Sequence, residues 1–156
     1  MKRTEIIKNL KLPFQFDERR LLNDLNIILN SNWIAHFNDQ DYEGKWNSLA
    51  LYAPQGDENN IFALSSTDNK SIKETALIKN CRCFKEILNQ FQCPLLSVRL
   101  LKLGTGTKIK PHEDYNLGYE NDYFRIHIPI TTNPHLLREE HIDQLSSDNN
   151  SDLNIL

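Results

Sequence analysis

The sequence lacks the features that mark secreted, membrane-spanning and nucleic-acid-binding proteins. Its 156 residues contain three cysteines, an odd number without framework spacing, which is typical of a reducing compartment. No apolar run approaches the length of a membrane span, and residues 1–11 contain no continuous apolar segment of a secretion signal. The net charge of −3 gives no basic footprint for nucleic acid. We therefore expect a soluble, cytoplasmic protein without nucleic-acid or membrane partners.

The residues that are present suit one compact domain. A hydrophobic share of 39% and a charged share of 25% are ordinary for a globular protein. Asp17 can cap a helix over residues 18–30, in which leucine and isoleucine recur at one-face spacing. A second helical stripe is formed by Leu77, Cys81, Phe84, Leu88 and Phe91, and Cys93-Pro94 ends it.

Strand-forming residues dominate the later part of the chain. Aromatic, β-branched and leucine-rich segments predict strands at residues 33–37, 46–52, 95–103 and 123–130, and a long loop at 53–69. This order predicts an α+β fold with a curved antiparallel sheet or barrel. Cys81 is expected on the buried stripe and Cys83 off it, so these thiols do not predict a structural zinc site, which needs four ligands.

Two polar pairs are candidates for chemistry. In His112-Glu113-Asp114, residues two apart on an extended backbone face the same side, so an imidazole and a carboxylate are aimed at one point. These are two thirds of the 2-His-1-carboxylate triad that holds iron(II), although His-x-Asp alone also occurs by chance.

In residues 123–130, Phe124, Ile126, Ile128 and Ile130 form an apolar face, and Arg125 and His127 lie on the other. Arginine suits a dicarboxylate because its planar group donates two parallel hydrogen bonds.

Three motifs in order resemble the aspartyl/asparaginyl β-hydroxylase family, closest to its bacterial proline-hydroxylase branch. They are the segments Ser97–Gly104, Ile109–Asp114 with its His-x-Asp, and Arg125–Pro134 with its Arg-x-His. The segments Trp33–Asn38 and Tyr42–Trp46 are also similar to that family. The resemblance covers roughly residues 12–134.

The resemblance implies a fold, cofactors and residue roles. The fold is a double-stranded β-helix, a cupin-like jelly roll with N-terminal helices packed on it. The cofactors are iron(II) and 2-oxoglutarate, which is decarboxylated to succinate while the substrate is hydroxylated. By position, His112 and Asp114 would bind iron, Arg125 and His127 would lie on the 2-oxoglutarate side, and Trp46 would lie near the substrate pocket.

The chain departs from the family after Pro134. The family places a second iron-binding histidine and then an arginine on a later strand, whereas His135 and His141 are the only histidines that remain here. Residues 136–141 lack the alternation of a barrel strand. We therefore expect a partial hydroxylase domain at residues 1–134, an incomplete barrel, and a divergent, partly disordered tail at 135–156.

Three functions follow from these patterns. The first is an iron(II)/2-oxoglutarate dioxygenase that hydroxylates an amino acid or an Asp, Asn or Pro side chain. The second is a catalytically inactive, truncated remnant that acts as a binding module. The third is a non-redox cupin in which His112, Asp114 and His127 form the metal cage.

Overall fold

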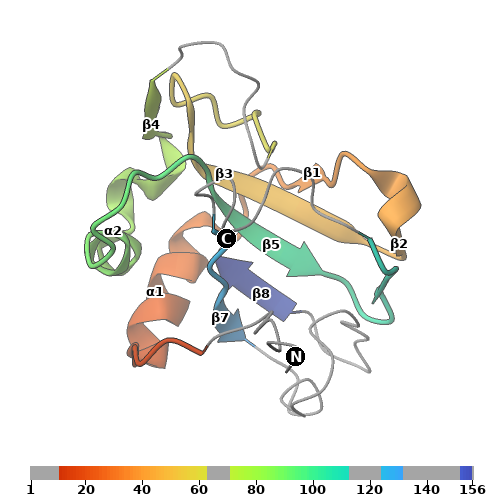
Figure 1. Cartoon of the computed structure of the whole chain (residues 1–156), viewed down its shortest axis with the longest axis horizontal. Helices are drawn as coiled ribbons and strands as arrows, with labels where there is room; N and C mark the ends of the chain where they lie inside the picture. Colours follow the sequence, from red (N-terminus) through yellow and green to blue (C-terminus); the bar gives the residue numbers. More distant parts are fainter. Residues whose placement is uncertain (1–10, 63–70, 113–123, 132–151, 156) are drawn as a thin grey trace, which may run out of the picture.

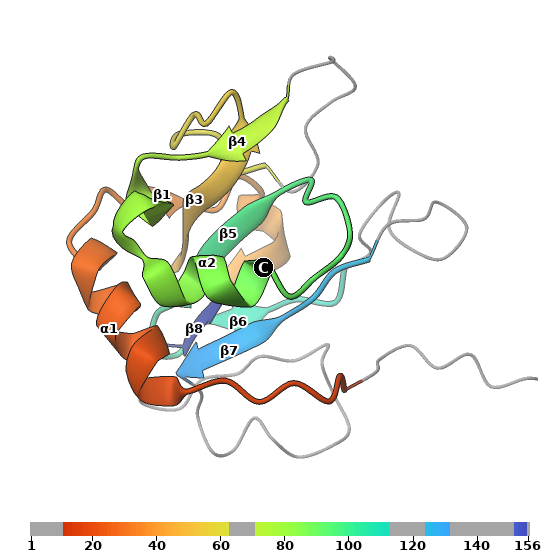
Figure 2. The same ribbon diagram turned by 90° about the vertical axis from the view of Figure 1, so that its left-hand side faces the viewer.

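Two helices lie on one face of an antiparallel β-sheet (Figures 1 and 2). The computed structural model describes residues 11–62, 71–112, 124–131 and 152–155. Its elements are, in order, α1 (Glu18–Ile28), β1 (Ile34–Ala35), η1 (Asp39–Asp41), β2 (Tyr42–Glu43), β3 (Trp46–Pro54), β4 (Ile72–Glu74), η2 (Leu77–Asn80), α2 (Arg82–Leu88), β5 (Val98–Leu103), β6 (Lys108–Ile109), β7 (Ile128–Thr131) and β8 (Asp152–Ile155).

The strands form one large sheet and one small sheet. The large sheet has the order β1-β3-β5-β8-β7, with β4 paired to β3, and the small sheet consists of β2 and β6. All the pairs are antiparallel, so the expected α+β fold with antiparallel strands is confirmed. Across the described ranges the sheet does not close into a barrel. No helix in those ranges has the length and apolar character needed to cross a bilayer.

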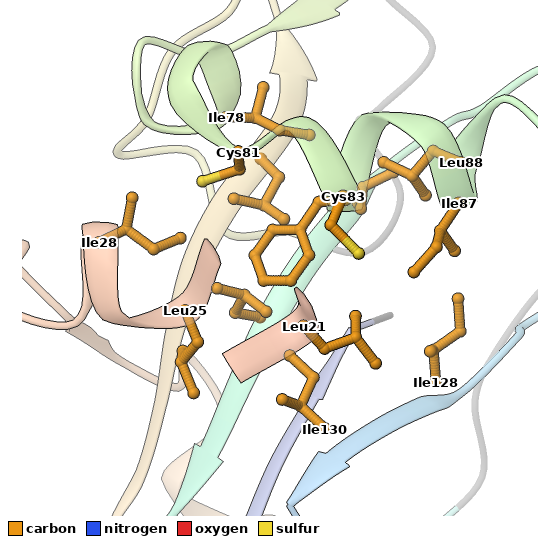
Figure 3. Close-up of a cluster of buried hydrophobic side chains, with 14 of the residues drawn as sticks. Leu21, Leu25, Ile28, Ile78, Cys81, Cys83, Ile87, Leu88, Ile128 and Ile130 are labelled. Carbon is orange, nitrogen blue, oxygen red and sulfur yellow. The ribbon is translucent and has the colours of Figure 1, made fainter. Parts of the chain in front are cut away.

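The large sheet presents two faces of different composition. One face carries the main core, in which Leu49 and Leu100 pack with side chains of α1 and α2. Ile128 and Ile130 of β7 belong to the same core (Figure 3). The other face carries Trp46, Leu101 and other residues that alternate with the core positions. The helices therefore cover only one side of the sheet.

Helix α1 begins where the sequence predicts it. The side chain of Asp17 accepts hydrogen bonds from the backbone N–H groups of Arg19 and Arg20, and so caps the first turn. Leu21, Leu25 and Ile28 are buried against the sheet. The helix ends at Ile28, two residues before the expected end at Asn30.

The second predicted helix is divided into two pieces. The 3₁₀ helix η2 ends at Asn80 and α2 begins at Arg82, because Cys81 between them has a non-helical backbone (φ −96°, ψ 80°). The first turn of α2 is capped from another helix: the backbone N–H of Phe84 donates to Oδ2 of the buried Asp24 of α1 at 2.8 Å. The prediction of one continuous helix was therefore wrong, although the five residues of the predicted stripe all contribute to the main core: Leu77, Cys81, Phe84, Leu88 and Phe91.

The expected position of one thiol was also wrong. Cys83, predicted to lie off the buried stripe, is buried in the main core together with Cys81 (Figure 3). Burial raises the pKa of Cys81 to about 11 and raises the pKa of Cys83. These two thiols are core residues, and Cys93 is exposed.

The tail predicted to be divergent contributes a strand to the sheet. Strand β8 pairs with β5 on one side, Leu100 opposite Ile155, and with β7 on the other, Ile128 opposite Ile155. Residues 132–151 lie outside the described residues, and the predicted boundary at residue 134 stays a prediction. At residues 152–155, however, the chain is part of the same sheet as the predicted domain.

We predict that replacing Asp24 destabilises the fold through α2. The Asp24→Ala variant loses the acceptor for the Phe84 N–H in a buried position, which typically costs about 1–3 kcal/mol. Asp24→Asn keeps an acceptor oxygen and serves as the matched control. Urea unfolding at neutral pH should place Asp24→Ala clearly below Asp24→Asn in stability, and equal midpoints for the two variants would contradict the capping role.

Candidate functional site

The segment that leads to His112 is held by the small sheet. Strand β6 pairs with β2, Ile109 opposite Tyr42, and the backbone N–H of Lys110 donates to the carbonyl oxygen of Asp41 at 2.7 Å. These bonds fix the backbone up to two residues before His112. His112, the first candidate iron ligand, therefore follows a segment whose backbone is fixed by hydrogen bonds.

The His112 imidazole is held in one tautomer. Its Nδ1 lies 2.8 Å from the carbonyl oxygen of Lys110. Because a carbonyl only accepts, Nδ1 carries the proton and donates it, which leaves Nε2 with a lone pair. This is the arrangement in which metal-binding histidines are usually held. The side chain of His112 is exposed, so Nε2 is accessible.

The partner predicted for His112 lies outside the described residues. Asp114 belongs to residues 113–123, and the two remaining candidate histidines, His135 and His141, belong to residues 132–151. Within the described ranges, no three His, Cys, Asp or Glu side chains gather closely enough to hold a metal. The convergence of His112 and Asp114 stays a prediction.

Arg125 and His127 precede a strand rather than lie within it. Strand β7 begins at Ile128, five residues after the predicted start. Ile126 and Ile128, on either side of His127, both pack in the main core, so alternation directs His127 to the opposite face of the sheet. Phe124, expected on the apolar face, is 70% exposed, which corrects the sequence prediction. It lies before the strand, where pairing with β8 does not direct its side chain inward.

Trp46 lies near two histidines on the face opposite the helices. It begins β3, is only 7% exposed, and stacks on His36 with ring centroids 3.8 Å apart and planes 12° apart. Tyr42 meets its edge at 5.6 Å, and the ring of His112 lies 6.5 Å away. The structure thus brings together Trp46 and His112, the residues predicted for the pocket and the metal.

The same face carries hydrogen-bond donors in need of acceptors. Among the described residues, neither Nε1 of Trp46 nor Oγ of Ser48 has a hydrogen-bond partner, although both atoms are buried. Arg99 of β5 lies diagonally across from Ser48, is 4% exposed, and donates from Nη1 to the carbonyl oxygen of Ile61 at 2.8 Å. A buried donor without an acceptor costs about 1–3 kcal/mol. These donors and the buried positive charge suit a carboxylate ligand.

His36 is a residue of this site that sequence reasoning missed. Its Nδ1 accepts a hydrogen bond from the backbone N–H of Asn38 at 3.3 Å. Burial, together with the nearby Arg99 guanidinium, lowers the pKa of His36 to about 4. The only sequence signal was its place in the Trp33–Asn38 segment of the family resemblance, because its environment arises from the pairing of β1 with β3.

The two sheets are joined by a turn that tolerates only glycine at one position. Gly44 has φ +105°, and a Cβ there would lie 2.8 Å from Oγ1 and 2.9 Å from Cα of Thr107. The Thr107 hydroxyl accepts from the backbone N–H of Lys45 and donates to the Lys45 carbonyl, both at 2.9 Å. This close approach links the turn after β2 to the turn before β6.

We predict that two glycine replacements lower the stability of the fold by different amounts. Gly106 also has a positive φ, +74°, but a Cβ added there would meet no atom within 4 Å, so Gly106→Ala should cost only the left-handed strain of about 1–2 kcal/mol. Gly44→Ala adds the overlap with Thr107, typically another ~1–3 kcal/mol. Urea unfolding of both variants checks this order, which a Gly106→Ala variant less stable than Gly44→Ala would reverse.

We predict that His36 makes stability depend on pH in the acidic range. Its folded pKa of about 4 lies below the ordinary 6.5, so between these values the unfolded chain binds a proton that the folded protein does not. This contribution to stability is complete above pH 6.5 and is lost as the pH falls toward about 4. Replacing His36 with Gln should therefore flatten the pH dependence of urea midpoints across that window, and an unchanged slope would contradict the burial of a neutral imidazole.

Comparison with known proteins agrees with the site residues in pointing to one family. A family profile described as aspartyl/asparaginyl beta-hydroxylase matches residues 15–147. A search of curated proteins finds no match. The profile spans most of the chain and contains His112, Arg125 and His127. This protein belongs to the aspartyl/asparaginyl β-hydroxylase family.

Proposed function

We propose that this protein is an iron(II)- and 2-oxoglutarate-dependent dioxygenase that hydroxylates an amino acid or an Asp, Asn or Pro side chain. Family membership supports a hydroxylase in general. The observation that carries the finer proposal is the orientation of His112. Its Nδ1–H is held by the Lys110 carbonyl, and its ring lies 6.5 Å from the ring of Trp46.

The donor set of the chain suits iron(II). His112 would supply one imidazole nitrogen and Asp114 a carboxylate oxygen, two of the three ligands of the facial triad. When bound, iron(II) supplies the activation of dioxygen that a protein side chain cannot perform. The task of the chain is to hold the ligands, orient the substrate and exclude water. Two protein ligands hold a metal less firmly than three, so the identity of a further ligand decides its affinity.

The same face suits a dicarboxylate cosubstrate. The buried Arg99 and the unpaired donors of Trp46 and Ser48 favour an anionic group with oxygen acceptors. Arg125 and His127, on the other end of the sheet, are the residues we propose for the 2-oxoglutarate side. The sheet order places β5 and β8 between β3 and β7, so such a ligand would lie across the sheet face.

The proposed scaffold is a double-stranded β-helix. In this fold, a large and a small sheet face one another across the metal site, with helices covering the outer face. The β2–β6 pair packs Tyr42 and Ile109 against the face that carries Trp46, as the smaller sheet would. From the cysteine content, we also propose a cytoplasmic location. We propose a small amino acid or a peptide as the substrate.

Two other functions stay open within the same family. An inactive member that serves as a binding module would keep the fold but would not form succinate. A non-redox cupin would use His127 as a third metal ligand beside His112 and Asp114. The position of His127, which is exposed and directed away from the helix core, is compatible with either role.

We predict that anaerobic addition of iron(II) and 2-oxoglutarate gives the weak visible absorption of a chelated 2-oxo acid, and that admission of oxygen gives succinate. His112→Ala removes an iron ligand and should weaken iron binding by at least ~100-fold, beyond the roughly 10–100-fold typical of losing an outer partner of a ligand. His127→Ala should keep iron binding and weaken 2-oxoglutarate binding.

Each alternative gives a different pattern in these measurements. Loss of iron binding in His127→Ala would favour the non-redox cupin. Absence of both the absorption and succinate in the wild-type protein would favour the binding module. His141→Ala is a further comparison, because unchanged iron binding there excludes His141 as the missing ligand.

A further inference from the structure

The turn that precedes β2 is held together mainly by the side chain of Asn38. Its Oδ1 accepts a hydrogen bond from the backbone N–H of Gln40 at 3.4 Å, and its Nδ2 donates to Oδ2 of Asp41 at 2.6 Å. The backbone bond of the same turn, from the Asp41 N–H to the Asn38 carbonyl, is 3.5 Å long, beyond the usual range for such bonds. Because bonds to a carboxylate are stronger than bonds between neutral groups, the contact between Asn38 and Asp41 is the firmest in this turn.

The two contacts require one orientation of the Asn38 amide. The backbone N–H of Gln40 can only donate, so it faces Oδ1, and the carboxylate of Asp41 can only accept, so it faces Nδ2. An aspartate at this position would cap η1 equally well, because Asp and Asn are equivalent as caps. It would, however, set a second carboxylate against that of Asp41. The amide group of Asn38 therefore has a task beyond capping.

The turn closed by Asn38 supports the strand that precedes His112. The carbonyl oxygen of Asp41, the last residue of η1, accepts from the backbone N–H of Lys110 at 2.7 Å. The adjoining ladder of β2 and β6 is only two residue pairs long, and so short a pair of strands has little stability of its own. Its other end is fixed by the hydroxyl of Thr107. The bond between Asp41 and Lys110 fixes the end nearer to His112.

Three consecutive hydrogen bonds therefore lead from Asn38 to the His112 ring. Asn38 holds Asp41, the Asp41 carbonyl holds the N–H of Lys110, and the Lys110 carbonyl accepts from Nδ1 of His112 at 2.8 Å. The last of these bonds decides which ring nitrogen of His112 carries the proton. If the Lys110 backbone moves, that carbonyl no longer faces Nδ1, and the ring loses its fixed tautomer and direction.

We propose that Asn38 is a positioning residue for His112, and that it holds the imidazole in the tautomer whose Nε2 is free for a metal ion. It acts through Asp41 and Lys110 and touches neither metal nor substrate. A purely structural cap would stabilise η1 without changing His112. This inference rests on the proposed function for its purpose, but the position and tautomer of the ring can be measured without metal.

The test exchanges the two side chains of the strongest contact. Asn38→Asp keeps the cap but sets two carboxylates against each other. Adding Asp41→Asn to that variant restores one donor and one acceptor in the reverse order and returns the formal net charge to −3. Asn38→Ser keeps a capping oxygen and adds no charge, so it replaces Asn38→Asp if the latter does not fold. Circular dichroism and urea unfolding check the overall fold of each variant.

Two NMR signals of the metal-free protein report on the chain of bonds. Hydrogen exchange of the Lys110 N–H reports its bond to Asp41, and the Thr75 N–H, which donates to the Leu51 carbonyl at 2.9 Å, is the reference. The ring-nitrogen shifts of His112, assigned by their absence from His112→Ala, report which nitrogen is protonated. They are read at about pH 8, where an ordinary imidazole is uncharged.

We predict that Asn38→Asp speeds exchange of the Lys110 N–H by at least about 10-fold, as expected for losing a hydrogen bond to a charged group. Exchange of the Thr75 N–H should not change, and His112 should become a mixture of tautomers. Anaerobic binding of iron(II) should weaken by about 10-fold, the lower end of the range for disturbing an outer partner of a metal ligand. Asn38→Ser should act in the same direction, and the double variant should recover all three properties.

The outcomes separate this inference from the proposed function. The positioning role is overturned by unchanged Lys110 exchange and unchanged His112 shifts in the single variants, or by a double variant that behaves like Asn38→Asp. Equal acceleration at Lys110 and Thr75 would indicate general destabilisation and would also overturn it. If the wild-type protein binds no iron(II) while the metal-free signals change and recover as predicted, the proposed chemistry fails and the positioning of His112 stands.

Discussion

The pairing of β3 with β5 is the constraint on which the rest of the structure depends. Its register, from Trp46 opposite Leu103 to Tyr52 opposite Val98, decides which side chains face the helices. A shift by one residue would exchange the two faces completely, because side chains alternate along a strand. Burial of Leu49 and Leu100 against α1 and α2 therefore holds Trp46 and its neighbours on the other face. The hydrophobic core fixes the candidate site without contributing an atom to it.

The C-terminal strand extends this constraint to the second candidate pair. Strand β8 runs between β5 and β7 and aligns Ile128 with Leu100 through Ile155. Since β7 then continues the helix-facing core with Ile128 and Ile130, the preceding His127 is directed to the same side of the sheet as Arg99. The predicted tail is thus the element through which the Arg-x-His segment is brought into register with β5.

The sequence predicted those elements whose causes are local. Asp17 caps α1 with its own side chain, and the leucine-rich β5 follows from composition alone. It did not predict the break at Cys81, because the group that caps α2 is Asp24, some sixty residues earlier in the chain. The same limit applies to Phe124, since its exposure depends on where β7 begins to pair with β8.

The candidate site shows more clearly that sequence patterns do not predict features that depend on residues distant in the chain. The His-x-Asp pattern singled out His112 because the two predicted iron ligands are only two residues apart in the chain. His36 belongs to no such pattern, and the role of a lone histidine depends on its surroundings in the folded protein. The pairing of β1 with β3 places its ring on Trp46. Burial and the nearby Arg99 then lower its pKa. Sequence reasoning therefore finds ligands that are adjacent in the chain more readily than groups assembled by the sheet.

The two histidines beside Trp46 differ in the ring nitrogen that the backbone engages. In His36 the backbone N–H of Asn38 donates to Nδ1, so the proton remains on Nε2 and the free edge of the ring is a donor. In His112 the Lys110 carbonyl accepts from Nδ1, so the free edge is a lone pair. A donor suits a carboxylate and a lone pair suits a metal ion. Both tautomers are set by backbone atoms two residues away. A donor edge and a lone-pair edge near the same indole ring therefore follow from local turns and need no further charged side chain.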